Sequence, residues 1–165
     1  MKVAVISDIH DNLKNLAVAL EQIEKLQADV LLFLGDFCAP FTFAQLAEGF
    51  SGPIHVVFGN NDGDLFLISQ IAAKHSHVKL HGQLAELELD GKRVGLNHYP
   101  DIAKRLAESG AYDAVFSGHD HKAYVHQIKN TLWANPGEVM GRFDNPSFGM
   151  YNTTTAEFLH VALAK

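Results

Sequence analysis

The first half of the chain alternates short apolar runs with stretches in which apolar residues recur at helical spacing. Lys2–Ser7 is short, β-branched and apolar, as buried strands are. A helix is predicted next, over about Asn12–Gln27, because its apolar residues fall three or four positions apart and Asp11 or Asn12 can cap it. The same alternation predicts elements over Val30–Leu34 (strand), Thr42–Gly49 (helix), Ile54–Phe58 (strand) and Asp62–Lys74 (helix).

The second half has the period-two pattern of strands. Leu84–Leu89 and Arg93–Asn97 flank Asp90-Gly91, which predicts a hairpin. A short helix is predicted over about Asp101–Ser109, where Pro100 suits the first turn and Gly110 ends the helix. Further strands are predicted over Ala114–Ser117, Ala123–Ile128, Thr131–Ala134, Gly149–Asn152 and Glu157–Leu163. This half is therefore predicted to be mostly antiparallel β.

The order βαβαβα followed by a strand-rich half favours an α/β (α+β) fold in which helices flank a β sandwich. A simple doubly wound sheet is the alternative. The sequence shows no internal repeat, low-complexity tract or linker, so a single domain over residues 1–165 is predicted.

Composition narrows the class of protein. Of the 165 residues, 47% are hydrophobic, which is typical of a soluble globular fold. Cys38 is the only cysteine, so an internal disulfide is excluded and a reducing, cytoplasmic location is expected. No apolar run is long enough for a membrane span. A net charge of −6 without a basic stripe disfavours a long nucleic acid as partner. Phosphate substrates stay possible, because bound cations would dominate the local field.

Polar residues with metal-binding side chains stand at the ends of the apolar runs. Each short motif alone has a structural alternative. Asp8 and His10, two positions apart in an extended segment, would point the same way, but they could also be a helix cap and an incidental histidine. Asp36 lies where α/β sheets place ligands, and its two oxygens can bridge cations, although Gly-Asp is also a common turn. The full ordered set is Asp8, His10, Asp36, Asn60, His98, His119 and His121.

The later members of the set are read in the same way. Asn60 offers a carbonyl oxygen within a run of turn-forming residues. His98 alone is more typical of a hydrogen-bonded structural histidine. His119 and His121, after an apolar strand, put two imidazoles on one side of a turn and favour metal binding. It is much less probable that suitable donors stand at several strand ends by coincidence than that they belong to one shared site.

The ordered motifs Asp-x-His, Gly-Asp, Gly-Asn-x-Asp, a single His and Gly-His-x-His resemble the calcineurin-like metallophosphoesterases. The turn Asn135-Pro136-Gly137 is similar to that of their small prokaryotic phosphodiesterase branch. The resemblance spans about residues 1–141 and implies a four-layer αββα sandwich with two mixed β-sheets flanked by helices. It also implies one metal held by Asp8, His10, Asp36 and His121. The second metal would be held by Asp36, Asn60, His98 and His119.

The resemblance implies metal-dependent hydrolysis of small phosphodiesters through a dinuclear centre. A hydroxide bridging the metals beside Asp36 would attack phosphorus, and no protein nucleophile is required. Many relatives have His directly after the ligand Asn, where this chain has Asn61, which cannot donate a proton near neutral pH. We therefore expect catalysis to rely on leaving groups that depart without protonation. Asp36 and Asn61 are the expected catalytic positions.

Two divalent metal ions are the expected cofactors, Mn²⁺ first, with Ni²⁺, Fe²⁺, Co²⁺ or Zn²⁺ as alternatives. A phosphomonoesterase or phosphatase and a non-catalytic interaction scaffold of the same fold are the alternative functions. The expected partner is a small phosphodiester substrate, and a homo-oligomer is possible.

Other polar residues have weaker patterns. Asp62 is expected to order its loop. Glu138, if it faced the site, would disfavour nearby anions, and Arg142 could contact a substrate phosphate. Cys38 is expected to be a small buried filler. The remaining histidines lack partner spacing and are expected to be structural: His55, His75, His77, His81, His126 and His160.

Overall fold

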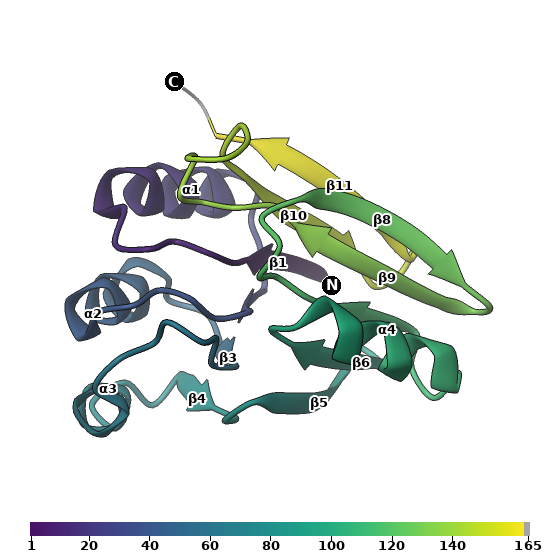
Figure 1. Cartoon of the computed structure of the whole chain (residues 1–165), viewed down its shortest axis with the longest axis horizontal. Coiled ribbons are helices and arrows are strands. Elements are labelled where there is room, and N and C mark those ends of the chain that lie inside the picture. The colour runs from purple at the N-terminus through teal and green to yellow at the C-terminus, as the bar shows by residue number, and fades with distance from the viewer. Residues whose placement is uncertain (164–165) are drawn as a thin grey trace.

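The computed structural model describes residues 1–163 and contains two mixed sheets and four helices (Figure 1). The six-stranded sheet has the order β11-β10-β1-β2-β3-β4. Its strands are β1 (Lys2–Ile6), β2 (Val30–Phe33), β3 (Ile54–Val56), β4 (Val78–Leu80), β10 (Ser147–Asn152) and β11 (Glu157–Ala162). Strands β1 to β4 run parallel to one another, whereas β10 pairs antiparallel with both of its neighbours.

The second sheet has five strands in the order β5-β6-β7-β9-β8. They are β5 (Leu84–Leu89), β6 (Lys92–Asn97), β7 (Ala114–Phe116), β8 (Ala123–Ile128) and β9 (Thr131–Pro136). The β5–β6 hairpin predicted at Asp90-Gly91 is confirmed, and both turn residues have positive φ, as that turn requires.

Helices cover the outer face of each sheet and complete a four-layer αββα sandwich (Figure 1). One apolar cluster joins the six-stranded sheet to α1 (Leu13–Lys25), α2 (Pro40–Gly49) and α3 (Leu65–Ala72). A second cluster fills the space between the sheets. A third packs α4 (Pro100–Ser109) against the five-stranded sheet. Among the described residues, no helix combines the length and apolar content needed to cross a bilayer.

The buried positions of β1 and β2 are all apolar because both faces of these strands are covered. In β1, Val3 and Val5 point into the layer between the sheets, and Ala4 and Ile6 point toward the helices. Side chains of a strand alternate between its faces, so a strand at the centre of two layers needs a continuous apolar run. The same rule divides the residues of β2 between the two clusters.

This topology brings the carboxyl ends of parallel strands from both sheets together. In one sheet β1, β2 and β3 are parallel, and in the other β6, β7 and β9 are parallel. Loops that follow parallel strands meet at one edge, where open α/β sheets bind ligands. The predicted donors all lie on such loops.

The second half is mostly antiparallel, as predicted, except that the crossover through α4 makes β6 parallel to β7, and β7 is parallel to β9. Two other sequence expectations are wrong in detail. Strand β4 is missing from the prediction, since it has only three residues and none is fully buried. Helix α3 begins at Leu65 rather than Asp62, because Asp64 caps it by accepting a hydrogen bond from the amide of Leu67.

Candidate metal centre

Tight turns after the strands aim the predicted donors at one another. Five of the seven have a left-handed backbone: Asp8, His10, Asp36, His119 and His121, with φ between 44° and 73°. Such a conformation is uncommon outside glycine and concentrates at functional sites. It rules out the extended segment expected for Asp8 and His10. Their amides instead donate to the carbonyls of Gly35 and Asp36, at 3.1 and 3.0 Å, so this turn is fastened to the next strand end.

Two glycines allow the turns to approach the carboxylates. A Cβ on Gly59 would lie 2.1 Å from Asp36 Oδ1, and a Cβ on Gly118 would lie 2.7 Å from Asp8 Oδ2. Real atoms do not come that close, so no larger residue fits at either position. The glycines of the Gly-Asn and Gly-His pairs are therefore required by close packing against the carboxylates as well as by the turns.

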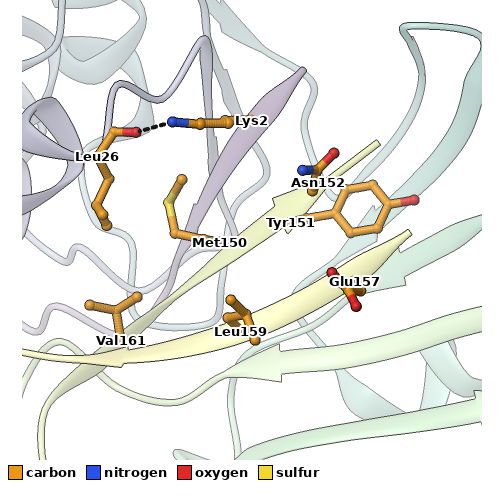
Figure 2. A pocket seen from close by; sticks show the side chains of 8 residues that line it. All are labelled: Lys2, Leu26, Met150, Tyr151, Asn152, Glu157, Leu159 and Val161. Carbon is orange, nitrogen blue, oxygen red and sulfur yellow. Dashed lines mark hydrogen bonds between the residues drawn. The ribbon is translucent and has the colours of Figure 1, made fainter. Parts of the chain in front are cut away.

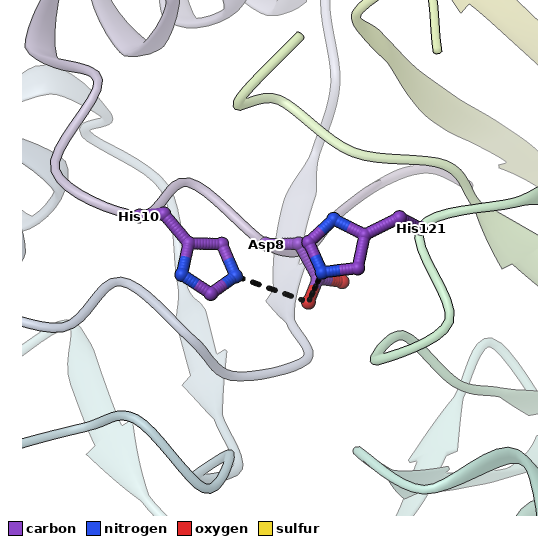
Figure 3. A group of neighbouring side chains, drawn as sticks. All are labelled: Asp8, His10 and His121. Atoms are coloured by element: carbon purple, nitrogen blue, oxygen red, sulfur yellow. Dashed lines mark ion pairs between the residues drawn. The ribbon is translucent and has the colours of Figure 1, made fainter. Parts of the chain in front are cut away.

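Asp8, His10 and His121 form the first group of donors (Figure 3). Asp8 Oδ1 lies 3.8 Å from His10 Nε2 and 3.7 Å from His121 Nε2. The two imidazole rings stack, with centroids 5.1 Å apart and planes inclined by 21°. Three ligand-type atoms from two separate loops therefore face a common point.

Asp36, His98 and His119 form the second group, and the side chain of Asn60 joins it. His98 Nε2 lies 3.2 Å from Asn60 Oδ1 and 3.2 Å from His119 Nδ1. Asp36 Oδ2 connects the two groups, because it lies 3.5 Å from His98 Nε2 and 3.5 Å from His10 Nε2. The structure thus brings all seven predicted residues together, with His119 and His121 in different groups.

The carboxylates determine the electrostatics of the site. Burial alone would raise the pKa of Asp36, but hydrogen bonds from His98 and Asn61 outweigh it and lower this pKa well below its ordinary value. The carboxylate of Asp8 raises the pKa of His10 against the effect of burial, and Asp36 adds to the rise. Burial lowers the pKa of His98, but Asp36 and Asp8 overcome it and the net shift is upward. The site therefore attracts positive charge.

A divalent cation would satisfy atoms that the protein leaves unpaired. Asp8 Oδ1 and His10 Nε2 are both buried, and neither has a hydrogen-bond partner among the described residues. Leaving such atoms unpaired is costly, so it calls for an explanation such as an ion. Carboxylate, amide and imidazole donors without a thiolate suit a hard or borderline divalent cation. The residues of the site fit such an ion.

Three of the imidazoles in the site contact a residue outside the seven donors through their Nδ1 atoms. The Nδ1 atoms of His98 and His121 lie 2.7 Å from Leu34 O and 2.6 Å from Glu138 Oε2. His10 Nδ1 lies 3.4 Å from Cys38 Sγ. Cys38 is therefore a half-buried neighbour of the site, not only the filler expected from the sequence. Burial and nearby carboxylates, Asp11 first, raise the pKa of its thiol to about 12, so it offers no thiolate.

Asn61 and Asp62 fasten the loop after β3. Asn61 donates its backbone N–H to Asp36 Oδ1 at 2.9 Å and its side-chain amide to Asp36 Oδ2 at 2.8 Å. Asp62 accepts hydrogen bonds from the backbone amides of Asp36, Cys38 and Gly59. The expectation that Asp62 orders its loop is confirmed. Glu138, by contrast, is fully buried behind His121 and does not face the site opening.

A hollow of about 310 Å³ adjoins His119 and is lined also by Tyr99, Pro100, Asp101 and Asp120. On the other side of the site, the ring of Phe143 contacts that of His121 at a centroid distance of 5.0 Å, and the guanidinium of Arg142 lies over Phe143. A separate apolar groove lies far from these residues along β10 and β11, with Leu26, Met150, Leu159 and Val161 in its lining (Figure 2). It contains none of the predicted donors.

Residues 1–156 match the calcineurin-like phosphoesterase superfamily domain. The chain belongs to that superfamily. A phosphodiesterase of Methanocaldococcus jannaschii is 26% identical over 166 residues, which cover 99% of each chain. The solved structure of an archaeal phosphodiesterase superposes with a TM-score of 0.91 at 25% identity, covering 99% of this chain and 100% of the other.

More distant solved structures share the fold. The Escherichia coli phosphoesterase Yfce has a TM-score of 0.70 at 21% identity, and zinc-bound Vps29 of Entamoeba histolytica has 0.69 at 16%. Both alignments cover 99% of this chain and 100% of the other. The calcineurin-like superfamily is metal-dependent, which agrees with the two donor groups of this chain.

Sequence reasoning did not identify every residue that shapes this phosphoesterase site. Glu138 and Cys38 contact the imidazoles, and nothing in their local sequence shows the direction of their side chains. The one available signal for Glu138 was a carboxylate directly after a tight Asn-Pro-Gly turn at the end of a strand.

Proposed function

We propose that this phosphoesterase hydrolyses small phosphodiesters at a centre of two divalent cations that share Asp36. Asp8, His10, Asp36 and His121 would hold one cation, and Asp36, Asn60, His98 and His119 the other. The observation that carries the proposal is the position of Asp36 Oδ2, 3.5 Å from an imidazole nitrogen of each donor group. One carboxylate oxygen between two donor sets is suited to bridging.

Two bound cations would supply Lewis-acid activation of water and charge compensation for the phosphate. The side chains of the protein would position the two cations. Asp36 is buried and held ionised by its hydrogen bonds, so it is ready to bind cations at neutral pH. The hollow beside His119 has room for a small phosphodiester.

The presence of Asn61 favours, as substrates, diesters with good leaving groups. Its amide cannot protonate a departing alkoxide. Mn²⁺ is the first candidate cation, and Ni²⁺, Fe²⁺, Co²⁺ and Zn²⁺ suit the same donors. The similarity to phosphodiesterases at 26% and 25% identity supports the diester activity.

The test uses cation-free protein to which Mn²⁺ is added back. We expect two Mn²⁺ per chain and hydrolysis of bis(4-nitrophenyl) phosphate that depends on them, with slower hydrolysis of 4-nitrophenyl phosphate. A preference for the monoester would favour the phosphatase alternative. Absence of both stoichiometric cation and hydrolysis would favour a scaffold and overturn the proposal.

A further inference from the structure

Glu138 is a buried carboxylate that the proposed reaction does not use. Its exposed fraction is 0%, and it lies directly after Gly137, whose positive φ of 83° turns the chain at the end of β9. Among the described residues, its one ion-pair partner is His121. A charge buried in this way is costly unless hydrogen bonds satisfy it.

The two carboxylate oxygens of Glu138 contact different groups. Oε1 accepts hydrogen bonds from the backbone amides of Phe143 and Asp144, at 2.6 and 2.9 Å. Oε2 lies 2.6 Å from His121 Nδ1. Because Oε1 already accepts two backbone hydrogen bonds, Glu138 is arranged as an acceptor, and its Oε2 can accept from His121 only when Nδ1 carries the proton. In that tautomer the imidazole has its lone pair on Nε2, the atom that faces Asp8 Oδ1.

This contact differs from those behind the other imidazoles. His98 is held by a backbone carbonyl and His10 by a sulfur atom, whereas His121 is held by a carboxylate. A carboxylate behind a ligating imidazole fixes both its tautomer and its orientation, and it raises the basicity of the nitrogen that binds the metal.

We propose that Glu138 is a positioning residue that holds His121 in its Nδ1–H tautomer and thereby sets the cation affinity of the group formed by Asp8, His10 and His121. The inference rests on the proposed function, since it concerns how tightly that site binds its cation. Glu138 acts through His121 and does not contact substrate.

Glu138→Gln tests the tautomer directly. The Gln oxygen can still accept from the amides of Phe143 and Asp144, which turns its NH₂ group toward His121 Nδ1. That nitrogen would then have to accept, so the neutral imidazole would shift to the Nε2–H form and lose its lone pair for the cation. A purely structural role predicts the opposite result, because Gln preserves the shape and the loop contacts.

The first measurement is the tautomer of His121 in cation-free protein by long-range ¹H–¹⁵N NMR, with His121→Asn to assign the signal. We expect Nδ1–H in the wild type and Nε2–H in Glu138→Gln. The second is calorimetric titration with Mn²⁺, in which Glu138→Gln should bind one of two ions about 10–100-fold more weakly. Glu86→Gln is the matched control, because Glu86 accepts a hydrogen bond from Tyr112 outside the site and its loss should change neither ion.

Wild-type affinity for both ions in Glu138→Gln would overturn the inference and leave the proposed function standing. An Nε2–H tautomer in the wild type would also overturn it, and this measurement holds even if the variant does not fold. Failure of the wild type itself to bind Mn²⁺ would overturn the proposed function.

Discussion

Imidazoles contact one another both in the candidate metal centre and at the His55–His81 pair, and the two places differ in the charges around them. In the metal centre, carboxylates of Asp8 and Asp36 raise the pKa of His10 and His98. Outside it, His55 Nδ1 lies 2.8 Å from His81 Nε2, and their rings stack with centroids 5.1 Å apart. There burial lowers both pKa values, that of His81 to about 4, and Lys79 lowers them further.

The difference shows that proximity of histidines alone does not define a cation site. The His55–His81 pair has two nitrogens in contact with each other, but the charge beside it is the ammonium of Lys79, which repels cations. The metal centre places unpaired carboxylate and imidazole atoms around a common point. Nearby carboxylates therefore distinguish the candidate metal-binding histidines from the His55–His81 pair.

The largest expected effect comes from removing the charge shared by the two donor groups. Asp36→Asn keeps the shape of the side chain but has no anionic oxygen with which to bridge two cations. We expect loss of at least one bound Mn²⁺ and a fall in kcat of about 10³-fold or more, the scale of a principal electrostatic contribution to the transition state. Calorimetry and hydrolysis of bis(4-nitrophenyl) phosphate measure the two quantities.

His55→Gln is the matched control for this experiment, because it alters an imidazole in the other pair. Its cation content and kcat should equal those of the wild type. An Asp36→Asn protein that keeps both ions and its rate would remove the basis of the comparison.

A smaller effect is expected when an imidazole is added beside the carboxylates. Asn61→His would put a ring next to Asp36, whose charge should raise the pKa of the new histidine and make it a proton donor. We expect the rate for alkyl leaving groups to rise by about 10–100-fold, within or just below the range of general acid catalysis. The measurement is kcat across phosphodiesters whose leaving groups differ in basicity.

In the wild type and in an Asn61→Ala control, the rate should fall steeply as the leaving alcohol becomes more basic, whereas Asn61→His should give a shallower slope. A flat dependence in the wild type would mean that another group already protonates the leaving oxygen.

Much of the fold and site follows from the sequence because its signals are local. Buried strands such as β2 are apolar at every position, and the Asp90-Gly91 hairpin has its own turn chemistry. The seven donors stand at strand ends, so their order along the chain predicts their meeting at one edge of the sheets.

The remaining features depend on tertiary arrangement. The parallel direction of β6 and β7 arises from the α4 crossover, which no residue within either strand specifies. His55 and His81 lie 26 positions apart, and they meet because β3 pairs with the unpredicted strand β4. The left-handed backbone at Asp8 and His10 comes from their hydrogen bonds to the loop after β2, so a period-two reading of those residues was wrong.

The smallest expected effect tests the structural histidines. Because folding lowers the pKa of His81 from 6.5 to about 4, the unfolded chain binds more protons between these pH values. The contribution of His81 to stability is therefore complete above about pH 6.5 and is lost as the pH falls toward 4.

His81→Gln removes this proton uptake. Between pH 7 and pH 5, Tm of the cation-free wild type should fall by about 2–4 °C more than Tm of the variant, or roughly 1 kcal/mol after allowance for solvent screening. Thermal unfolding in EDTA measures the difference. Equal falls would show that the pair titrates normally, and the contrast in charge between the two histidine environments would then be wrong.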